Sequence, residues 1–178
     1  NQGLEVIGWR EVPTNQMVVG EIAGLTLPHI EQVFVRPAEN VRLNEKELNT
    51  KTFIARKIAE HKVYGTKMSQ ASYFYLPSLS TRTLIYKGLL VPEDIERFYT
   101  DLTDKRVVTR LALVHQRFST NTFPTWDLAQ PFRYMCHNGE INTYRGNLNR
   151  MIAREELLAS DFFGDDIKSI LPIVLHGK

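Results

Sequence analysis

Cysteine is almost absent from this chain: Cys136 is the only one in 178 residues. A single cysteine cannot form an internal disulfide, which favours a reducing compartment and predicts the cytoplasm. The sequence also lacks a signal peptide and any apolar run of about 20 residues, so it indicates no membrane partner. Basic and acidic residues nearly cancel, at 22 and 20, which gives no electrostatic reason to expect nucleic acid as a partner.

Apolar periodicity predicts a mixture of strands and helices. We expect strands at residues 4–12, 31–36, 72–79, 82–86, 106–116 and 132–137. We expect helices at residues 45–62 and 143–158, and a short helix that begins at Pro92. Asn44 and Glu47 have the spacing of a capping box at the start of the first helix, whose many Lys and Glu residues are interpreted as a solvated face. Strand pairs followed by helices suit α+β layering.

The most informative segment is Arg-Tyr-Met-Cys-His-Asn-Gly-Glu-Ile-Asn-Thr at residues 133–143. The side-chain amide of Asn138 and the backbone N–H of Gly139 can both direct donors at one developing negative charge, as an oxyanion hole requires. Glycine also lets the backbone approach a substrate closely. Asn-Gly is, however, the commonest tight-turn dipeptide, so this pair alone favours a turn.

A second polar cluster begins at Arg117, directly after the apolar run of residues 106–116. Its guanidinium can bind the α-carboxylate of an amino acid in a bidentate fork, while the hydroxyls of Ser119 or Thr120 hold the remaining polar atoms. Taken alone, Arg117 is interpreted equally well as a structural ion-pair partner. Trp126, which follows this cluster, is expected to pack in the core rather than to cover a ligand.

Two further motifs accompany these clusters: Gly-Trp-Arg-Glu-Val-Pro at residues 8–13, and Phe-Tyr-Leu-Pro-Ser-Leu-Ser-Thr-Arg-Thr-Leu-Ile-Tyr-Lys-Gly at residues 74–88. In this order, and over nearly the whole chain, the motifs resemble the class II glutamine amidotransferase domain of glutamate synthases. The resemblance implies an α+β fold, the four-layer α/β/β/α sandwich of N-terminal-nucleophile hydrolases, incomplete in this chain. It implies hydrolysis of glutamine to glutamate and ammonia, with the ammonia used for reductive transfer to 2-oxoglutarate.

The same resemblance assigns roles to the site residues. Arg117 would bind the α-carboxylate of glutamine, assisted by Ser119 or Thr120. Asn138 and Gly139 would form the oxyanion hole. The nucleophile of the family is an N-terminal cysteine, and residue 1 here is Asn1. We therefore expect residues 1–178 to be a single partial domain that lacks its nucleophile segment and its C-terminal remainder, and that is inactive alone.

Cys136 is the obvious substitute nucleophile, but a lone cysteine is more often a buried packing residue. Its neighbour His137 would point to the opposite face of the expected strand, so the two would not form a Cys–His pair. A cysteine cluster and a Gly-rich phosphate loop are both lacking, so we expect no cofactor or metal in this chain.

The resemblance places FMN and an iron–sulfur cluster in the rest of the parent enzyme. The implied partners are glutamine, the remaining synthase domains of the same polypeptide, and either a small reductase subunit or ferredoxin as electron donor. The compartment would be the plastid stroma if a transit peptide lies upstream. Two alternatives stay open: a catalytically inert scaffold or interaction fragment, and another class II amidotransferase, against which the motifs at residues 8–13 and 79–88 argue.

Overall fold

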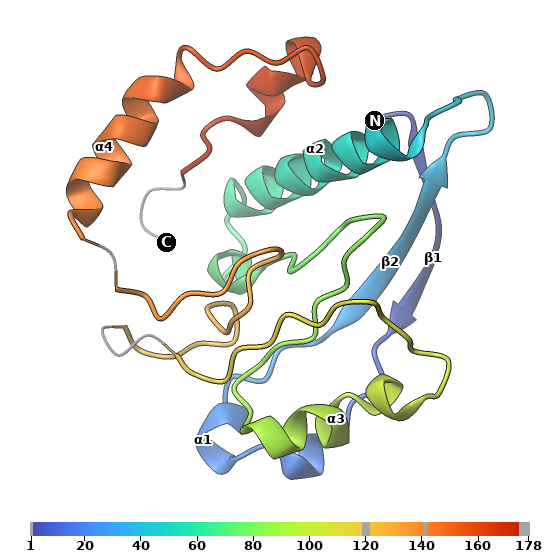
Figure 1. Cartoon of the computed structure of the whole chain (residues 1–178), viewed down its shortest axis with the longest axis vertical. Helices are drawn as coiled ribbons and strands as arrows, with labels where there is room; N and C mark the ends of the chain where they lie inside the picture. Colours follow the sequence, from blue (N-terminus) through green and yellow to red (C-terminus); the bar gives the residue numbers. More distant parts are fainter. Residues whose placement is uncertain (1, 119–121, 141, 175–178) are drawn as a thin grey trace. The chain divides into compact units, whose positions relative to one another are not determined.

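The computed structural model describes residues 2–118, 122–140 and 142–174. Its strands are β1 (Leu4–Glu11) and β2 (Glu31–Pro37), and its α-helices are α1 (Glu21–Gly24), α2 (Glu45–Tyr64), α3 (Ile95–Phe98) and α4 (Tyr144–Glu155) (Figure 1). Short 3₁₀ helices are η1 (Gln16–Val18), η2 (Ala71–Tyr73), η3 (Pro92–Asp94), η4 (Thr100–Thr103) and η5 (Gly164–Ile170). The predicted mixture of helix and strand is confirmed. None of the helices in the described part of the chain is long and apolar enough to cross a membrane.

The chain folds into two compact units. The first consists of Asn1–Glu5, Pro37–Arg82 and Ile141–Lys178, and the second of Val6–Arg36 and Thr83–Glu140. The first unit therefore contains α2 and α4, and the second contains most of the β1–β2 pair together with α1 and α3. The predicted site residues that the structure describes, Arg117, Asn138 and Gly139, fall within the second unit.

The predicted capping box fixes the start of α2. The backbone N–H of Glu47 donates to Oδ1 of Asn44 at 3.0 Å, and the backbone N–H of Asn44 donates to Oε2 of Glu47 at 2.8 Å. Two acidic residues, Glu45 and Glu47, lie in the first turn, and two basic ones, His61 and Lys62, lie in the last, which suits the helix dipole. Local sequence signals thus determine this helix, and its prediction is confirmed.

The charged residues of α2 are not all solvated, which corrects the expectation from the sequence. Arg56 and Glu60 are buried, and their side chains form an ion pair of 2.9 Å one helical turn apart. The guanidinium of Arg56 also lies 5.1 Å from the ring centre of Phe53, which makes an edge-on contact with Phe163. Because each charge partly offsets the desolvation of the other, this turn can be covered by the segment that contains Phe163.

Trp126 organises the core of the second unit, together with Val12, Phe98 and Tyr99. Only 4% of Trp126 is exposed, and its indole N–H donates to the carbonyl of Ala23 at 3.0 Å. A Cβ atom at Gly88 would lie 2.4 Å from Cζ3 of Trp126, so glycine is required for this close approach. The prediction that Trp126 packs in the core is confirmed.

Four predicted strands are wrong. Residues 72–79, 82–86 and 106–116 contain no strand, and residues 132–137 contain only an isolated bridge between Phe132 and Met135, with Arg133 at a φ of 50° in the turn. The one sheet among the described residues pairs β1 with β2. A strand needs hydrogen bonds from a neighbouring strand, and alternation of apolar residues does not supply that neighbour.

The two other predicted helices are confirmed. A helical segment begins at Pro92 as η3 and continues as α3, and α4 occupies most of the range expected at residues 143–158. Within α4, a Cβ atom at Gly146 would lie 2.8 Å from Cγ2 of Thr143. Close packing against the residue before the helix therefore accounts for a glycine inside the helical pattern.

Lys87 is a buried cation in the second unit, with 5% of the residue exposed. Its ammonium group donates to the carbonyl of Asp127 at 2.6 Å and lies 4.6 Å from the ring centre of Phe132. Burial lowers the pKa of Lys87 from 10.5 to about 8; the Asp127 carboxylate opposes this shift and the Arg133 guanidinium adds to it. The folded chain therefore disfavours the protonated amine.

This shift predicts a dependence of stability on pH. Between pH 8 and 10.5 the unfolded chain keeps the proton on Lys87 and the folded chain releases it, so the contribution of Lys87 to the free energy of unfolding rises with pH. We expect urea unfolding of the wild type and of Lys87→Met to show the wild type gaining stability relative to the variant as the pH is raised from 7 to 10. A difference in the free energy of unfolding between the wild type and Lys87→Met that stays constant from pH 7 to 10 would contradict the lowered pKa of Lys87 in the folded chain.

Candidate functional site

A histidine brings the two predicted polar clusters together within the second unit. Nε2 of His115 lies 3.1 Å from Oδ1 of Asn138, a residue 23 positions further along the chain. The backbone N–H of Arg117 donates to Nδ1 of the same imidazole ring at 3.2 Å. The segment that carries Arg117 is therefore adjacent to the segment that carries Asn138 and Gly139. The residue predicted to bind the substrate carboxylate and those predicted to bind the oxyanion are therefore carried by neighbouring segments.

The chain bends at Gly139, and the Asn-Gly pair forms no hydrogen-bonded turn among the backbone contacts of the described residues. Its φ of 85° belongs to the left-handed region, which favours glycine. Its backbone N–H donates to Nδ1 of His137 at 2.9 Å. The side chain of Gln130 holds the backbone of His137 on both sides, since it donates to the His137 carbonyl at 2.8 Å and accepts from the His137 N–H at 3.2 Å. A ligand that uses the Gly139 N–H must therefore displace the His137 ring.

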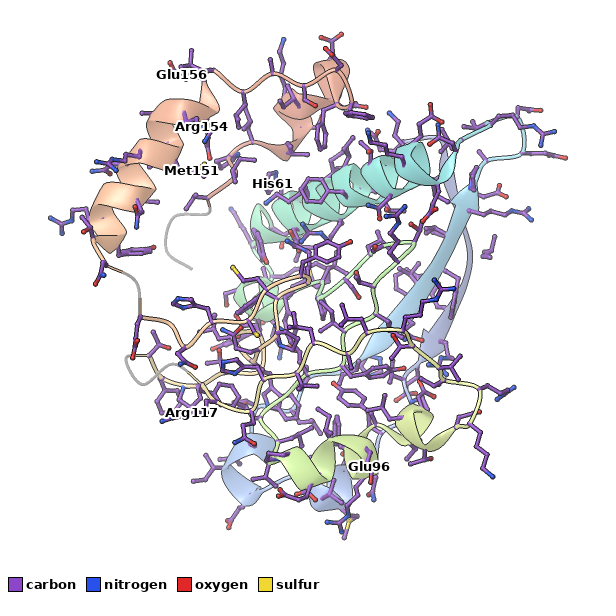
Figure 2. All side chains as sticks on the ribbon, in the orientation of Figure 1. His61, Glu96, Arg117, Met151, Arg154 and Glu156 are labelled. Atoms are coloured by element: carbon purple, nitrogen blue, oxygen red, sulfur yellow. The ribbon has the colours of Figure 1, made fainter. Side chains whose placement is uncertain are left out.

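Arg117 is exposed, and its side chain is labelled in Figure 2. Among the residues that the structure describes it has no ion-pair partner, so the alternative interpretation of a structural ion pair gains no support from them. Ser119 and Thr120 lie outside the described residues. Arg117 is therefore the one residue of the predicted carboxylate site that the structure describes, and the His115 imidazole that accepts its backbone N–H is an addition from the structure.

Cys136 is half-buried and lies two residues before Asn138. The expected strand, on which His137 would face away from Cys136, does not form in this segment. Nδ1 of His137 accepts the Gly139 N–H, so this nitrogen is not available to Cys136. Among the described residues, no group of three or more His, Cys, Asp or Glu side chains could hold a metal ion.

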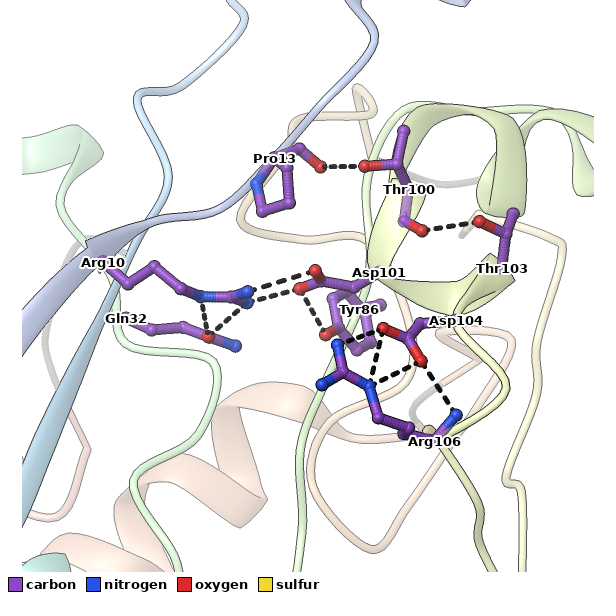
Figure 3. Close-up of polar contacts among 9 residues, drawn as sticks. All are labelled: Arg10, Pro13, Gln32, Tyr86, Thr100, Asp101, Thr103, Asp104 and Arg106. Carbon is purple, nitrogen blue, oxygen red and sulfur yellow. Dashed lines mark hydrogen bonds and ion pairs between the residues drawn. The ribbon is translucent and has the colours of Figure 1, made fainter.

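Sequence reasoning missed a second polar network in the same unit, centred on Arg10 and Asp101 (Figure 3). The Arg10 guanidinium forms an ion pair with the Asp101 carboxylate and donates to Oε1 of Gln32 at 2.7 Å, and the Tyr86 hydroxyl donates to Asp101 at 3.1 Å. The hydrogen bond from Arg10 holds the pKa of Asp101 below its ordinary value, and burial raises the pKa of Tyr86. Since these groups satisfy one another across β1, β2 and η4, the network stabilises the fold.

Comparison with known proteins identifies one family. The sequence profile of the family described as "Glutamine amidotransferases class-II" matches residues 1–178. The chain is 47% identical to the glutamate synthase [NADPH] large chain of Bacillus subtilis and 45% identical to ferredoxin-dependent glutamate synthase 2, chloroplastic, of Arabidopsis thaliana; each alignment covers 97% of this chain. It is 40% identical to glutamate synthase [NADH] of Saccharomyces cerevisiae over 98% of this chain. The chain spans only 11%, 10% and 8% of these three relatives, respectively.

Proposed function

The chain belongs to the class II glutamine amidotransferases, and we propose that it supplies the glutaminase site of a glutamate synthase. The sequence identity of 40–47% to three glutamate synthases with different electron donors supports a glutamate synthase rather than another class II amidotransferase. The observation that carries the proposal is the contact of His115 with Asn138, which brings the Arg117 segment next to the Asn-Gly pair. The chemistry of the site needs these two elements close together.

In the proposed reaction glutamine is held by its α-carboxylate and attacked at its side-chain amide. The guanidinium of Arg117 binds the carboxylate, with Ser119 or Thr120 assisting. Attack by a thiolate produces a tetrahedral oxyanion, which accepts hydrogen bonds from Nδ2 of Asn138 and, once the His137 ring is displaced, from the backbone N–H of Gly139. Collapse to a thioester releases ammonia, and water then releases glutamate. The ammonia serves reductive transfer to 2-oxoglutarate in a synthase domain.

The fold is proposed to be the four-layer α/β/β/α sandwich of N-terminal-nucleophile hydrolases. FMN and an iron–sulfur cluster are predicted in other domains, with ferredoxin or a small reductase subunit as electron donor. The compartment is predicted to be the cytoplasm or the plastid stroma; relatives named as chloroplastic occur, such as the protein from Arabidopsis thaliana.

Replacement of Arg117 tests the carboxylate site. Hydrogen bonds to charged groups contribute about 1.5–3 kcal/mol, so Arg117→Ala is expected to raise the KM for glutamine about 10–150-fold in the full-length protein, with a smaller change in kcat. Arg110→Ala is the matched control, because Arg110 is also exposed and lies in the same irregular segment. The measurement is glutamate release from glutamine.

The outcomes separate the competing functions. Equal KM values for Arg117→Ala and the wild type would remove Arg117 from the substrate site. A folded full-length protein with no glutaminase activity would favour the inert scaffold or interaction fragment. Glutaminase activity with transfer of ammonia to an acceptor other than 2-oxoglutarate would favour another class II amidotransferase.

A further inference from the structure

We infer that His115 is a positioning residue that holds the side-chain amide of Asn138 with its NH₂ group toward the substrate oxygen. This inference rests on the proposed glutaminase function. It assigns to His115 a task that is separate from binding glutamine and from the chemical step, because the imidazole acts through Asn138. Three features of the described residues support it.

The first feature is the tautomer of the His115 ring. Its Nδ1 accepts the backbone N–H of Arg117 at 3.2 Å and therefore carries no proton. In a neutral imidazole one ring nitrogen is an acceptor and the other a donor. The proton of His115 must then lie on Nε2, the atom that faces Asn138. The backbone of the Arg117 segment thus sets the direction of the next hydrogen bond.

The second feature is the orientation of the amide. Nε2–H of His115 donates to Oδ1 of Asn138 across 3.1 Å, so the amide oxygen is occupied and both hydrogens on Nδ2 remain for other acceptors. A rotation of the amide by half a turn would exchange these atoms. It would direct an oxygen at the developing oxyanion and would place two donors, Nε2–H and Nδ2–H, against each other. The His115 contact disfavours that state.

The third feature is the lack of another restraint. Among the described residues, the contact with His115 is the only side-chain hydrogen bond of Asn138, and Asn138 is exposed. His115 is half-buried, so its ring is the better fixed of the two side chains. The orientation of the amide therefore depends on one imidazole, which is itself attached to the backbone that presents Arg117.

Substitution of His115 by a matched pair of residues tests the inference. The amide of His115→Gln keeps a donor near the position of Nε2, whereas His115→Met has a similar length and no donor. In the full-length protein we expect His115→Met to lower kcat for glutamine hydrolysis about 10-fold and His115→Gln to lower it less than about 3-fold, with KM for glutamine nearly unchanged in both. A loss that is equal in the two variants would overturn the inference, because packing rather than donation would then explain it.

A double-mutant cycle identifies the residue through which His115 acts. In the Asn138→Ala background, His115→Met is expected to leave kcat unchanged, since no amide remains to be oriented. A further 10-fold loss in that background would overturn the inference, as would an unchanged kcat for His115→Met in the wild-type background. The proposed function fails by a different result, namely a folded full-length wild-type protein that does not hydrolyse glutamine. Circular dichroism of each variant, with rates expressed per folded molecule, removes any loss caused by unfolding.

Discussion

Replacement of Asn138 by alanine is expected to lower kcat for glutamine hydrolysis by about 10²–10³-fold, which corresponds to about 2.7–4 kcal/mol of transition-state stabilisation. The amide is proposed to donate to an oxygen that becomes negative only after attack on glutamine. Removal of such a donor raises the barrier without weakening the binding of the substrate, so KM should change little. The measurement is steady-state glutamate release by the full-length protein.

Asn147 provides a matched control for this substitution. Its side-chain Nδ2 donates to the carbonyl of Asn142 at 3.0 Å within the first unit, and so it is an amide donor with a structural partner. Asn147→Ala should leave kcat within about 2-fold of the wild type, because a neutral hydrogen bond of this kind contributes about 1 kcal/mol to folding and none to the reaction. Equal effects of the Asn138 and Asn147 substitutions would remove Asn138 from the oxyanion hole.

The elements that the sequence predicts correctly depend on local signals. The capping box at Asn44 and Glu47 begins α2, and the apolar spacing between residues 143 and 158 marks α4. Residues 106–116 are as rich in apolar residues as β1, yet Val108, Leu111 and Val114 are 84%, 82% and 79% exposed. A strand is stabilised by a neighbouring strand that its own sequence does not encode. An apolar run therefore predicts a strand only where such a neighbour is present.

The candidate site shows the same division between local and long-range information. Sequence motifs indicate Arg117, Asn138 and Gly139 because each residue type suits its proposed task. No motif in the sequence indicates His115 in the same way, since its contact with Asn138 spans 23 residues. One local signal existed: in an extended chain residues two positions apart lie on the same face, which places His115 and Arg117 together. That spacing does not reveal that the imidazole binds the backbone N–H of Arg117 and the side chain of Asn138.

Trp126 should have the largest effect on stability of any single side chain in the second unit. Trp126→Ala removes a side chain whose residue is 4% exposed and whose ring centre lies 5.8 Å from that of Phe98. Loss of a buried tryptophan costs about 3–5 kcal/mol, through lost burial and through the cavity that remains. The measurement is equilibrium urea unfolding of this chain followed by far-ultraviolet circular dichroism.

Trp9 is the matched control for Trp126, because it is the other tryptophan of the chain and is 65% exposed. Trp9→Ala should change the free energy of unfolding by less than about 0.5 kcal/mol, as is usual for exposed positions. Trp126→Phe separates packing from hydrogen bonding, since it keeps an aromatic ring beside Phe98 and leaves the carbonyl of Ala23 without its indole donor. The carbonyl still accepts the Thr26 N–H at 3.3 Å, so the loss of the indole hydrogen bond alone should cost about 0.5–1.5 kcal/mol. Equal losses for Trp126→Ala and Trp9→Ala would mean that Trp126 does not belong to the core.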